Sequence, residues 1–137
     1  MSHPLPEPGS PADWLRHARS DLLVAQTPTA PGVLRETLCY HLQQAAEKSL
    51  KAVLIYFDIA PPRTHNLKML IELMPAAFPV PDSVASAASL TDYAVTTRYP
   101  GDYEPIPFAQ AQDAVQVAQR VRRQLRRWLP QGSRSSD

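Results

Sequence analysis

The 137-residue sequence has little cysteine, little glycine and no long apolar run, and each shortage excludes a class of protein. A single cysteine, Cys39, cannot build a disulfide framework or a cysteine zinc cluster within the chain. With only four glycines, there is no glycine-rich phosphate loop. No apolar run reaches the roughly 18 residues that a membrane-spanning helix needs. The composition, 44% hydrophobic and 20% charged, instead predicts one soluble globular domain, and the single cysteine fits the reducing interior of a cytoplasmic protein.

Proline is abundant, with 15 residues, about twice its usual share. The prolines separate five proline-free runs, at 12–27, 32–60, 63–74, 82–99 and 108–129. Because proline lacks an amide hydrogen and its ring clashes with the preceding turn of a helix, these runs are the predicted helices. We therefore expect a helical domain over 12–129, with flexible tails at 1–11 and 130–137.

Apolar residues recur in these runs at spacings of three and four, as in amphipathic helices. Ser10 is the predicted cap of the first helix and Thr64 that of the short third one. The fourth run places Val84, Ala88, Thr91 and Val95 on one stripe, and the last run has apolar residues from Phe108 to Leu129. No run alternates with period two. The predicted fold class is all-α, an antiparallel up-and-down bundle of four to five helices.

Continuing the stripe of the fourth run by one step reaches Arg98, which would place its guanidinium toward the core at the helix end. A charge in that position needs a partner, because an unpaired buried charge costs several kcal/mol. Arg98 could clamp a phosphate, or it could pair with Asp102 or Glu104. The adjacent Tyr99 and Tyr103 could stack on a base, accept an AMP group from a partner enzyme, or pack against the bundle.

A second group of polar residues lies along the second run. His41, Gln44, Lys48 and Lys51 share or border one stripe at helical spacing. They could line a dimer cleft and bind a nucleotide phosphate, or they could form a solvated face with a Glu47–Lys51 pair. His65, next to the expected Thr64 cap, is interpreted as a hydrogen-bonding residue of the capping loop. Since no His-x-x-x-His or paired carboxylate spacing occurs, we predict no metal and no cofactor.

Charge is unevenly distributed along the chain. Residues 114–137 carry six arginines against one acid, whereas residues 1–113 carry eight basic and twelve acidic residues. The arginines at 120, 122, 123, 126 and 127 point in several directions of one helix, so all five cannot face one groove. They could contact RNA or an acidic partner, or they could complement the helix dipole.

Three segments together resemble the HEPN domain family: Cys39–Ala52 with its Gln-Gln-Ala-Ala-Glu-Lys stretch, Pro62–Leu67 with Thr-His-Asn-Leu, and Arg98-Tyr99-Pro100. The resemblance implies a helical bundle, usually a homodimer, often encoded beside a minimal nucleotidyltransferase. Many members are metal-independent endoribonucleases or toxins that use an arginine and, four to six residues later, a histidine. Arg98 matches the arginine, but Tyr103, Glu104 and Pro105 stand where the histidine is expected.

That difference leaves three functions open. The first is a nucleotide- or RNA-phosphate-binding module, using His41, Gln44, Lys48, Arg98 and Tyr99, paired with a minimal nucleotidyltransferase in a toxin–antitoxin-like system. The second is a ribonuclease in which Arg98 acts with Tyr103 or a rearranged His41. A tyrosine, with a pKa of about 10, is a poor base at neutral pH, whereas a histidine, at about 6.5, is a good one. The third is a non-catalytic oligomerising adaptor.

Overall fold

A computed structural model describes residues 4–26, 30–94 and 104–130 of the chain. Its elements in chain order are α1 (Pro11–Gln26), α2 (Arg35–Tyr56), α3 (Leu67–Glu72), α4 (Asp82–Ala85), the 3-10 helix η1 (Ser86–Ala94) and α5 (Phe108–Trp128). No strand occurs in these described ranges, and none of their helices is long and apolar enough to cross a membrane. The predicted all-α fold class is confirmed.

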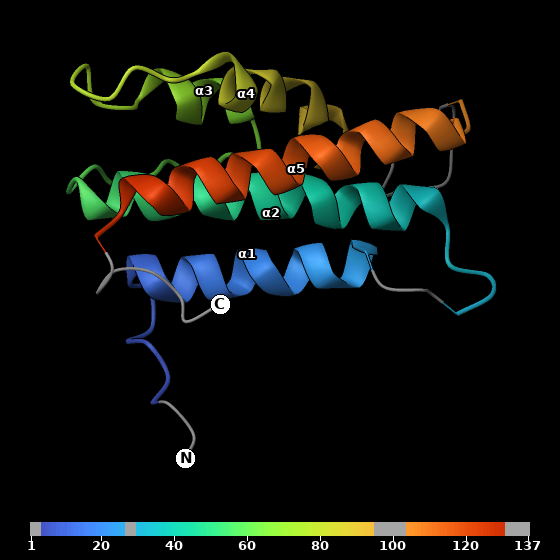
Figure 1. The fold of residues 1–137 in the computed structure, drawn as a ribbon, viewed down its shortest axis with the longest axis horizontal. Coiled ribbons are helices and arrows are strands. Elements are labelled where there is room, and N and C mark those ends of the chain that lie inside the picture. Colours follow the sequence, from blue (N-terminus) through green and yellow to red (C-terminus); the bar gives the residue numbers. More distant parts are fainter. Residues whose placement is uncertain (1–3, 27–29, 95–103, 131–137) are drawn as a thin grey trace.

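The helices form an up-and-down bundle around α2 (Figure 1). Helix α2 runs antiparallel to α1, the chain returns through α3, α4 and η1, and α5 then runs back alongside α2. Because α2 contacts α1, α3, η1 and α5, it is the central helix of the bundle. The predicted architecture is therefore correct, with the short third helix present as α3 and the predicted fourth helix replaced by α4 and η1.

Local sequence signals fix the start of α1. The Ser10 hydroxyl accepts a hydrogen bond from the Asp13 amide at 3.2 Å, and the Gly9 amide donates to the Asp13 carboxylate at 3.0 Å. The first bond satisfies an amide that the first turn of a helix leaves without a partner, and the second ties the residue before the cap to Asp13. The Gly9 hydrogen bond, followed by that of Arg16, lowers the pKa of Asp13. Ser10 is the cap that the sequence predicted.

Helix α3 has a different cap from the predicted one. The Asn66 side-chain oxygen accepts hydrogen bonds from the amides of Lys68 at 3.1 Å and Met69 at 3.4 Å. The Thr64 hydroxyl instead accepts from the Asn66 amide at 3.1 Å, one step before the helix. The prediction of Thr64 as the cap was therefore wrong by two residues, because an asparagine follows that caps equally well.

This assignment gives a first testable prediction. Asn66→Ala should lower the free energy of unfolding by about 1 kcal/mol, the usual cost of removing a cap. Thr64→Ala should cost less than half of that, because only one amide outside the helix loses its partner. Urea unfolding followed by circular dichroism compares the two variants. A larger loss in Thr64→Ala than in Asn66→Ala would contradict the assignment.

The fourth run does not form the single α-helix that its stripe predicted. After the four residues of α4, the chain tightens into η1. The buried residues recur with a period of three, at Val84, Ala87, Leu90 and Tyr93, because a 3-10 helix has three residues per turn. Serine hydroxyls within the segment donate to carbonyls three residues earlier, from Ser86 to Ser83 at 3.1 Å and from Ser89 to Ser86 at 2.8 Å. Such bonds compete with regular α-helix formation.

The altered period removes the basis for the predicted placement of Arg98. That prediction extended the sequence 84, 88, 91, 95 by one step, but the described part of the segment buries 84, 87, 90 and 93 instead. Arg98, Tyr99, Asp102 and Tyr103 themselves lie outside the described residues. Their proposed roles stay predictions from the sequence.

Helix α5 follows its predicted apolar stripe over most of its length. Four side chains of this stripe are buried, Ala118, Val121, Leu125 and Leu129, whereas near its start Ala114 is buried and the predicted Val115 is only partly so. The first residue, Phe108, is 60% exposed, and the Arg35 guanidinium lies 5.4 Å from the centre of its ring. The prediction that Phe108 belongs to the core was wrong, because the first turn of α5 extends beyond the buried part of the bundle.

Cys39 is fully buried within the hydrophobic core. Desolvation by burial, with a smaller effect of the Glu36 charge, raises the pKa of its thiol to about 11. The thiolate is the reactive form of cysteine, so this residue packs rather than reacts at neutral pH.

The buried thiol is a probe of folding. At pH 8, native protein should react with iodoacetamide at least about a hundredfold more slowly than urea-unfolded protein, because the thiolate fraction falls about tenfold per unit of pKa. Mass spectrometry of the alkylated chain measures both rates. Equal rates in the two states would show that Cys39 is accessible in the native fold.

Candidate functional site

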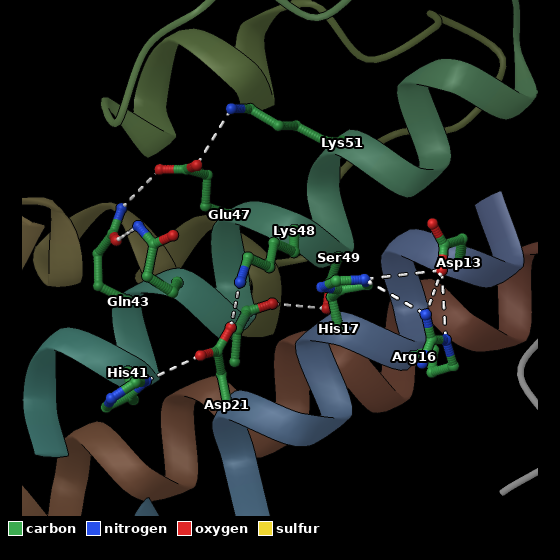
Figure 2. Close-up of polar contacts among 12 residues, drawn as sticks. Asp13, Arg16, His17, Asp21, His41, Gln43, Glu47, Lys48, Ser49 and Lys51 are labelled. Atoms are coloured by element: carbon green, nitrogen blue, oxygen red, sulfur yellow. Dashed lines mark hydrogen bonds and ion pairs between the residues drawn. The ribbon is translucent and has the colours of Figure 1, made fainter. Parts of the chain in front are cut away.

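A carboxylate from α1 holds two of the predicted phosphate-binding residues of α2 (Figure 2). His41 Nδ1 lies 2.8 Å from Asp21 Oδ1, and Lys48 Nζ donates to Asp21 Oδ2 at 2.7 Å. Asp21 is only 8% exposed, so both of its oxygens depend on these partners. The structure thus brings His41 and Lys48 together on Asp21, whose charge compensates that of Lys48.

The sequence pattern of α1 indicates that Asp21 lies on the apolar side of the helix, although Asp21 was not among the predicted site residues. Trp14, Ala18, Asp21 and Ala25 follow one another at spacings of four, three and four, which places Asp21 on the same side of the helix as apolar residues. A carboxylate on such a stripe needs a partner from another element. That partner could not be named from the sequence, because Asp21 and His41 are 20 residues apart.

A second carboxylate, Glu47 of α2, is the centre of a buried polar cluster. Lys51 Nζ donates to Glu47 Oε2 at 3.1 Å, and Gln43 Nε2 donates to Oε1 at 3.2 Å. The His65 Nδ1 atom lies 2.8 Å from the same Oε1. Glu47 is 3% exposed, so the predicted Glu47–Lys51 pair exists but the predicted solvated face does not.

The remaining predicted residues of this region belong to the same cluster. Gln44 donates to the Gln43 side-chain oxygen at 2.7 Å and is buried. The carbonyl of His65 accepts from Gln43 at 3.0 Å, which ties the segment before α3 to α2. His65 is therefore a hydrogen-bonding residue of the connection, as the sequence predicted, and its partners are on α2. Among the residues that the structure describes, no group of three His, Cys, Asp or Glu side chains could hold a metal ion.

An arginine-lined groove lies where α1 and α5 meet. From α1 it is lined by Arg19, Leu22, Leu23 and Gln26, and from α5 by Gln119, Arg122, Arg123 and Arg126. We call these eight residues the arginine groove. Its lining contains four guanidinium groups and no carboxylate, and it encloses about 280 Å³ that is open to solvent. This groove was not predictable from the sequence, because Arg19 and Arg123 come together only through the packing of α1 against α5.

Three of the five arginines of the C-terminal cluster, Arg122, Arg123 and Arg126, line the arginine groove. This agrees with the expectation that the five could not all face one groove. Arg122 is 8% exposed, and its Nη2 donates to the Leu15 carbonyl at 3.4 Å. Arg123 is exposed beside it. Arg120, outside the groove, donates to Gln116 at 3.2 Å.

The fold and the polar clusters define the class of this protein. It is an all-helical up-and-down bundle whose central helix is joined to its neighbours by buried carboxylates. The model of the HEPN domain family matches residues 11–128, and the chain belongs to this family.

Comparisons with individual proteins support the same assignment. The crystal structure of TT1696 from Thermus thermophilus is 30% identical in sequence, with a TM-score of 0.75. The match covers 85% of this chain and 96% of TT1696. None of the curated proteins compared with the chain matches it.

Proposed function

We propose that this HEPN-family protein is a binding module for the phosphate groups of nucleotides or RNA. We further propose that it acts as a homodimer, paired with a minimal nucleotidyltransferase in a toxin–antitoxin-like system. The observation that supports phosphate binding is the arginine groove, with four guanidinium groups and no acid in its lining. Guanidinium groups bind phosphate oxygens through two parallel hydrogen bonds, which makes arginine well suited to this role.

Phosphate binding is tested by the salt dependence of affinity. A fluorescein-labelled RNA of 20 nucleotides and a labelled ATP are titrated with the protein at several potassium chloride concentrations. If three to four arginines contact phosphates, the logarithm of the RNA affinity should fall with the logarithm of salt at a slope of about −2 to −3. Absence of binding to both probes at low salt would overturn this function and favour the adaptor.

The pairing with a nucleotidyltransferase is supported by the resemblance of Cys39–Ala52 and Thr64–Leu67 to family members with such partners. Native co-purification from the producing organism, followed by mass spectrometry, tests it. Recovery of a nucleotidyltransferase in a stable complex is the expected result. If none is recovered and the neighbouring reading frame encodes none, the pairing is overturned.

The homodimer is supported by exposed apolar side chains near one end of the bundle. Val33 and Leu34 precede α2, and Phe108 starts α5, where Arg35 lies over its ring. Apolar side chains gathered on a surface are typical of interaction sites. Static light scattering should give about twice the 15.2 kDa mass of the chain, and the monomer mass at micromolar concentration would contradict the dimer.

One contact favours a metal-independent ribonuclease as the second candidate. Asp21 orients His41 through Nδ1 and leaves Nε2 as the ring nitrogen able to accept a proton. In this mechanism His41 takes the proton of a 2′-hydroxyl, which attacks the adjacent phosphate and releases the 5′ oxygen, while Arg98 stabilises the phosphate charge. The test is RNA cleavage in EDTA by wild type, Arg98→Ala, His41→Ala and Tyr103→Phe at matched dimer content. Cleavage that survives both the Arg98 and the His41 substitution would exclude this site.

A further inference from the structure

Residues 4–8, with the sequence Pro-Leu-Pro-Glu-Pro, lead away from the helices as a segment without helix or strand (Figure 1). We call this segment the N-terminal arm. Leu5, between two of its prolines, is 74% exposed, more than any other large apolar side chain of the described residues. Three prolines in five residues favour the polyproline II conformation and limit the conformational entropy that is lost on binding. The arm therefore presents an apolar side chain on a stiff segment.

A turn fixes the position at which the N-terminal arm leaves the bundle. The Ser10 amide donates to the Glu7 carbonyl at 3.1 Å, with Pro8 and Gly9 between them. Gly9 has a φ of 79°, as the third residue of a type II turn requires. Its amide donates to the Asp13 carboxylate at 3.0 Å, which ties the turn to the first turn of α1. The arm is therefore anchored at the end of the bundle where α1 begins.

A patch of exposed apolar side chains lies at the opposite end of the bundle. It consists of Val33, Leu34 and Phe108, together with Arg35, whose guanidinium lies over the Phe108 ring. We call these four residues the Phe108 patch. Because α2 begins at Arg35 and runs antiparallel to α1, the patch lies near the end of α1 (Figure 1). The 16 residues of α1 extend over about 24 Å, whereas an arm of five residues spans only about 15 Å. The arm therefore cannot reach the patch of its own chain.

The N-terminal arm and the Phe108 patch are chemically complementary. Leu5 and the prolines offer apolar surface to Phe108, and proline-rich segments typically bind to aromatic side chains. Glu7 adds an exposed carboxylate to the arm, and Arg35 adds a guanidinium to the patch. Arg35 Nη1 donates to the Ile106 carbonyl at 3.1 Å. Since a guanidinium has five N–H donors, it can hold this carbonyl and a carboxylate at the same time.

We propose that the N-terminal arm of one chain binds the Phe108 patch of a second copy, whose arm binds the patch of the first. This inference rests on the homodimer of the proposed function and names the segment that joins its two chains. Two copies that lie side by side in opposite directions bring each arm next to the patch of the other chain. Because the two contacts are identical, the arrangement has two-fold symmetry and closes at two chains.

The test is charge reversal in the full chain, with the dissociation constant of the dimer measured by analytical ultracentrifugation. Glu7→Arg and Arg35→Glu each place like charges together in both contacts of the dimer. Each should raise the dissociation constant at least about tenfold, because two favourable contacts become repulsive. Leu5→Ser should weaken the dimer by a similar factor, because it removes apolar surface from both contacts. Circular dichroism establishes that each variant is folded.

The matched controls are Glu72→Arg and Arg120→Glu. They make the same charge changes at exposed positions outside the arm and the patch. Both control variants should dimerise like wild type, because neither changes a contact between an arm and a patch.

A mixture of the Glu7→Arg and Arg35→Glu chains distinguishes arm exchange from a general loss of stability. In a dimer with one chain of each variant, both contacts again join opposite charges. The mixture should therefore recover most of the wild-type affinity, although each variant alone does not. If wild type is dimeric and the single variants dimerise equally well, or if mixing fails to restore the dimer, arm exchange is overturned and the homodimer stands. If wild type is a monomer at micromolar concentration, the homodimer of the proposed function fails, and arm exchange fails with it.

Discussion

Replacement of Glu47 by alanine should lower the free energy of unfolding by about 3–5 kcal/mol, the usual cost of removing one partner from a buried ion pair. Glu47 accepts hydrogen bonds from Lys51 and Gln43 and lies 2.8 Å from His65 Nδ1. The side chain of Lys51 is almost as buried as that of Glu47, so its ammonium group would be left without a counter-charge. Urea unfolding followed by circular dichroism measures the loss.

Two further variants separate this effect from a general cost of substitution. Glu72→Ala removes an exposed carboxylate at the end of α3 and should change stability by no more than about 0.5 kcal/mol. The double variant Glu47→Leu/Lys51→Met removes both charges and should recover most of the loss, because buried ion pairs can often be replaced by apolar residues of similar volume. A double variant as unstable as Glu47→Ala would show that the cost comes from packing and not from the unpaired lysine.

Features determined by neighbouring residues were predictable from the sequence. The cap of α1 depends on Ser10 and Asp13, which are three residues apart, and the Ser10 hydroxyl accepts from the Asp13 amide as a cap does. The apolar stripe of α5 depends on a regular period over many residues, so Ala118, Val121, Leu125 and Leu129 are core positions as predicted. Such signals do not depend on how the helices later pack together.

The period of a short helix was not predictable in the same way. Between α4 and η1, the difference between three and 3.6 residues per turn moves the third buried position from Thr91 to Leu90 and the fourth from Val95 to Tyr93. Apolar and small residues occupy both sets of positions, so composition alone does not distinguish them. The error matters for function, because the predicted orientation of Arg98 depended on this register.

Contacts between residues of different helices were also not predictable from the sequence. His41 and Lys48 share a helix face and were predicted as free phosphate donors, but α1 places Asp21 against both of them. Arg19 and Arg123 are about a hundred residues apart in the sequence, and only the packing of α1 on α5 makes them parts of one groove.

The contact of Asp21 with α2 leads to the second large effect. Asp21→Ala should lower the free energy of unfolding by about 2–3 kcal/mol, because a buried carboxylate with two charge-assisted partners is removed. The loss should be smaller than that of Glu47→Ala, since the Lys48 side chain is 23% exposed and can regain contact with water. Urea unfolding of the single variants Asp21→Ala and Lys48→Met and of the double variant gives the coupling energy between the two residues.

The same variants test whether the two polar regions are independent. Asp21 contacts residues of α2, whereas the arginine groove is lined by residues of α1 and α5 only. Asp21→Ala should therefore weaken the fold and leave the ATP affinity of the folded protein within about twofold of wild type, because sites without shared partners act additively. Arg19→Glu/Arg123→Glu should show the reverse, with lost ATP affinity and nearly unchanged stability. If Asp21→Ala reduced ATP affinity as much as the groove variant does, the Asp21 cluster would belong to the ligand site rather than to the joint between α1 and α2.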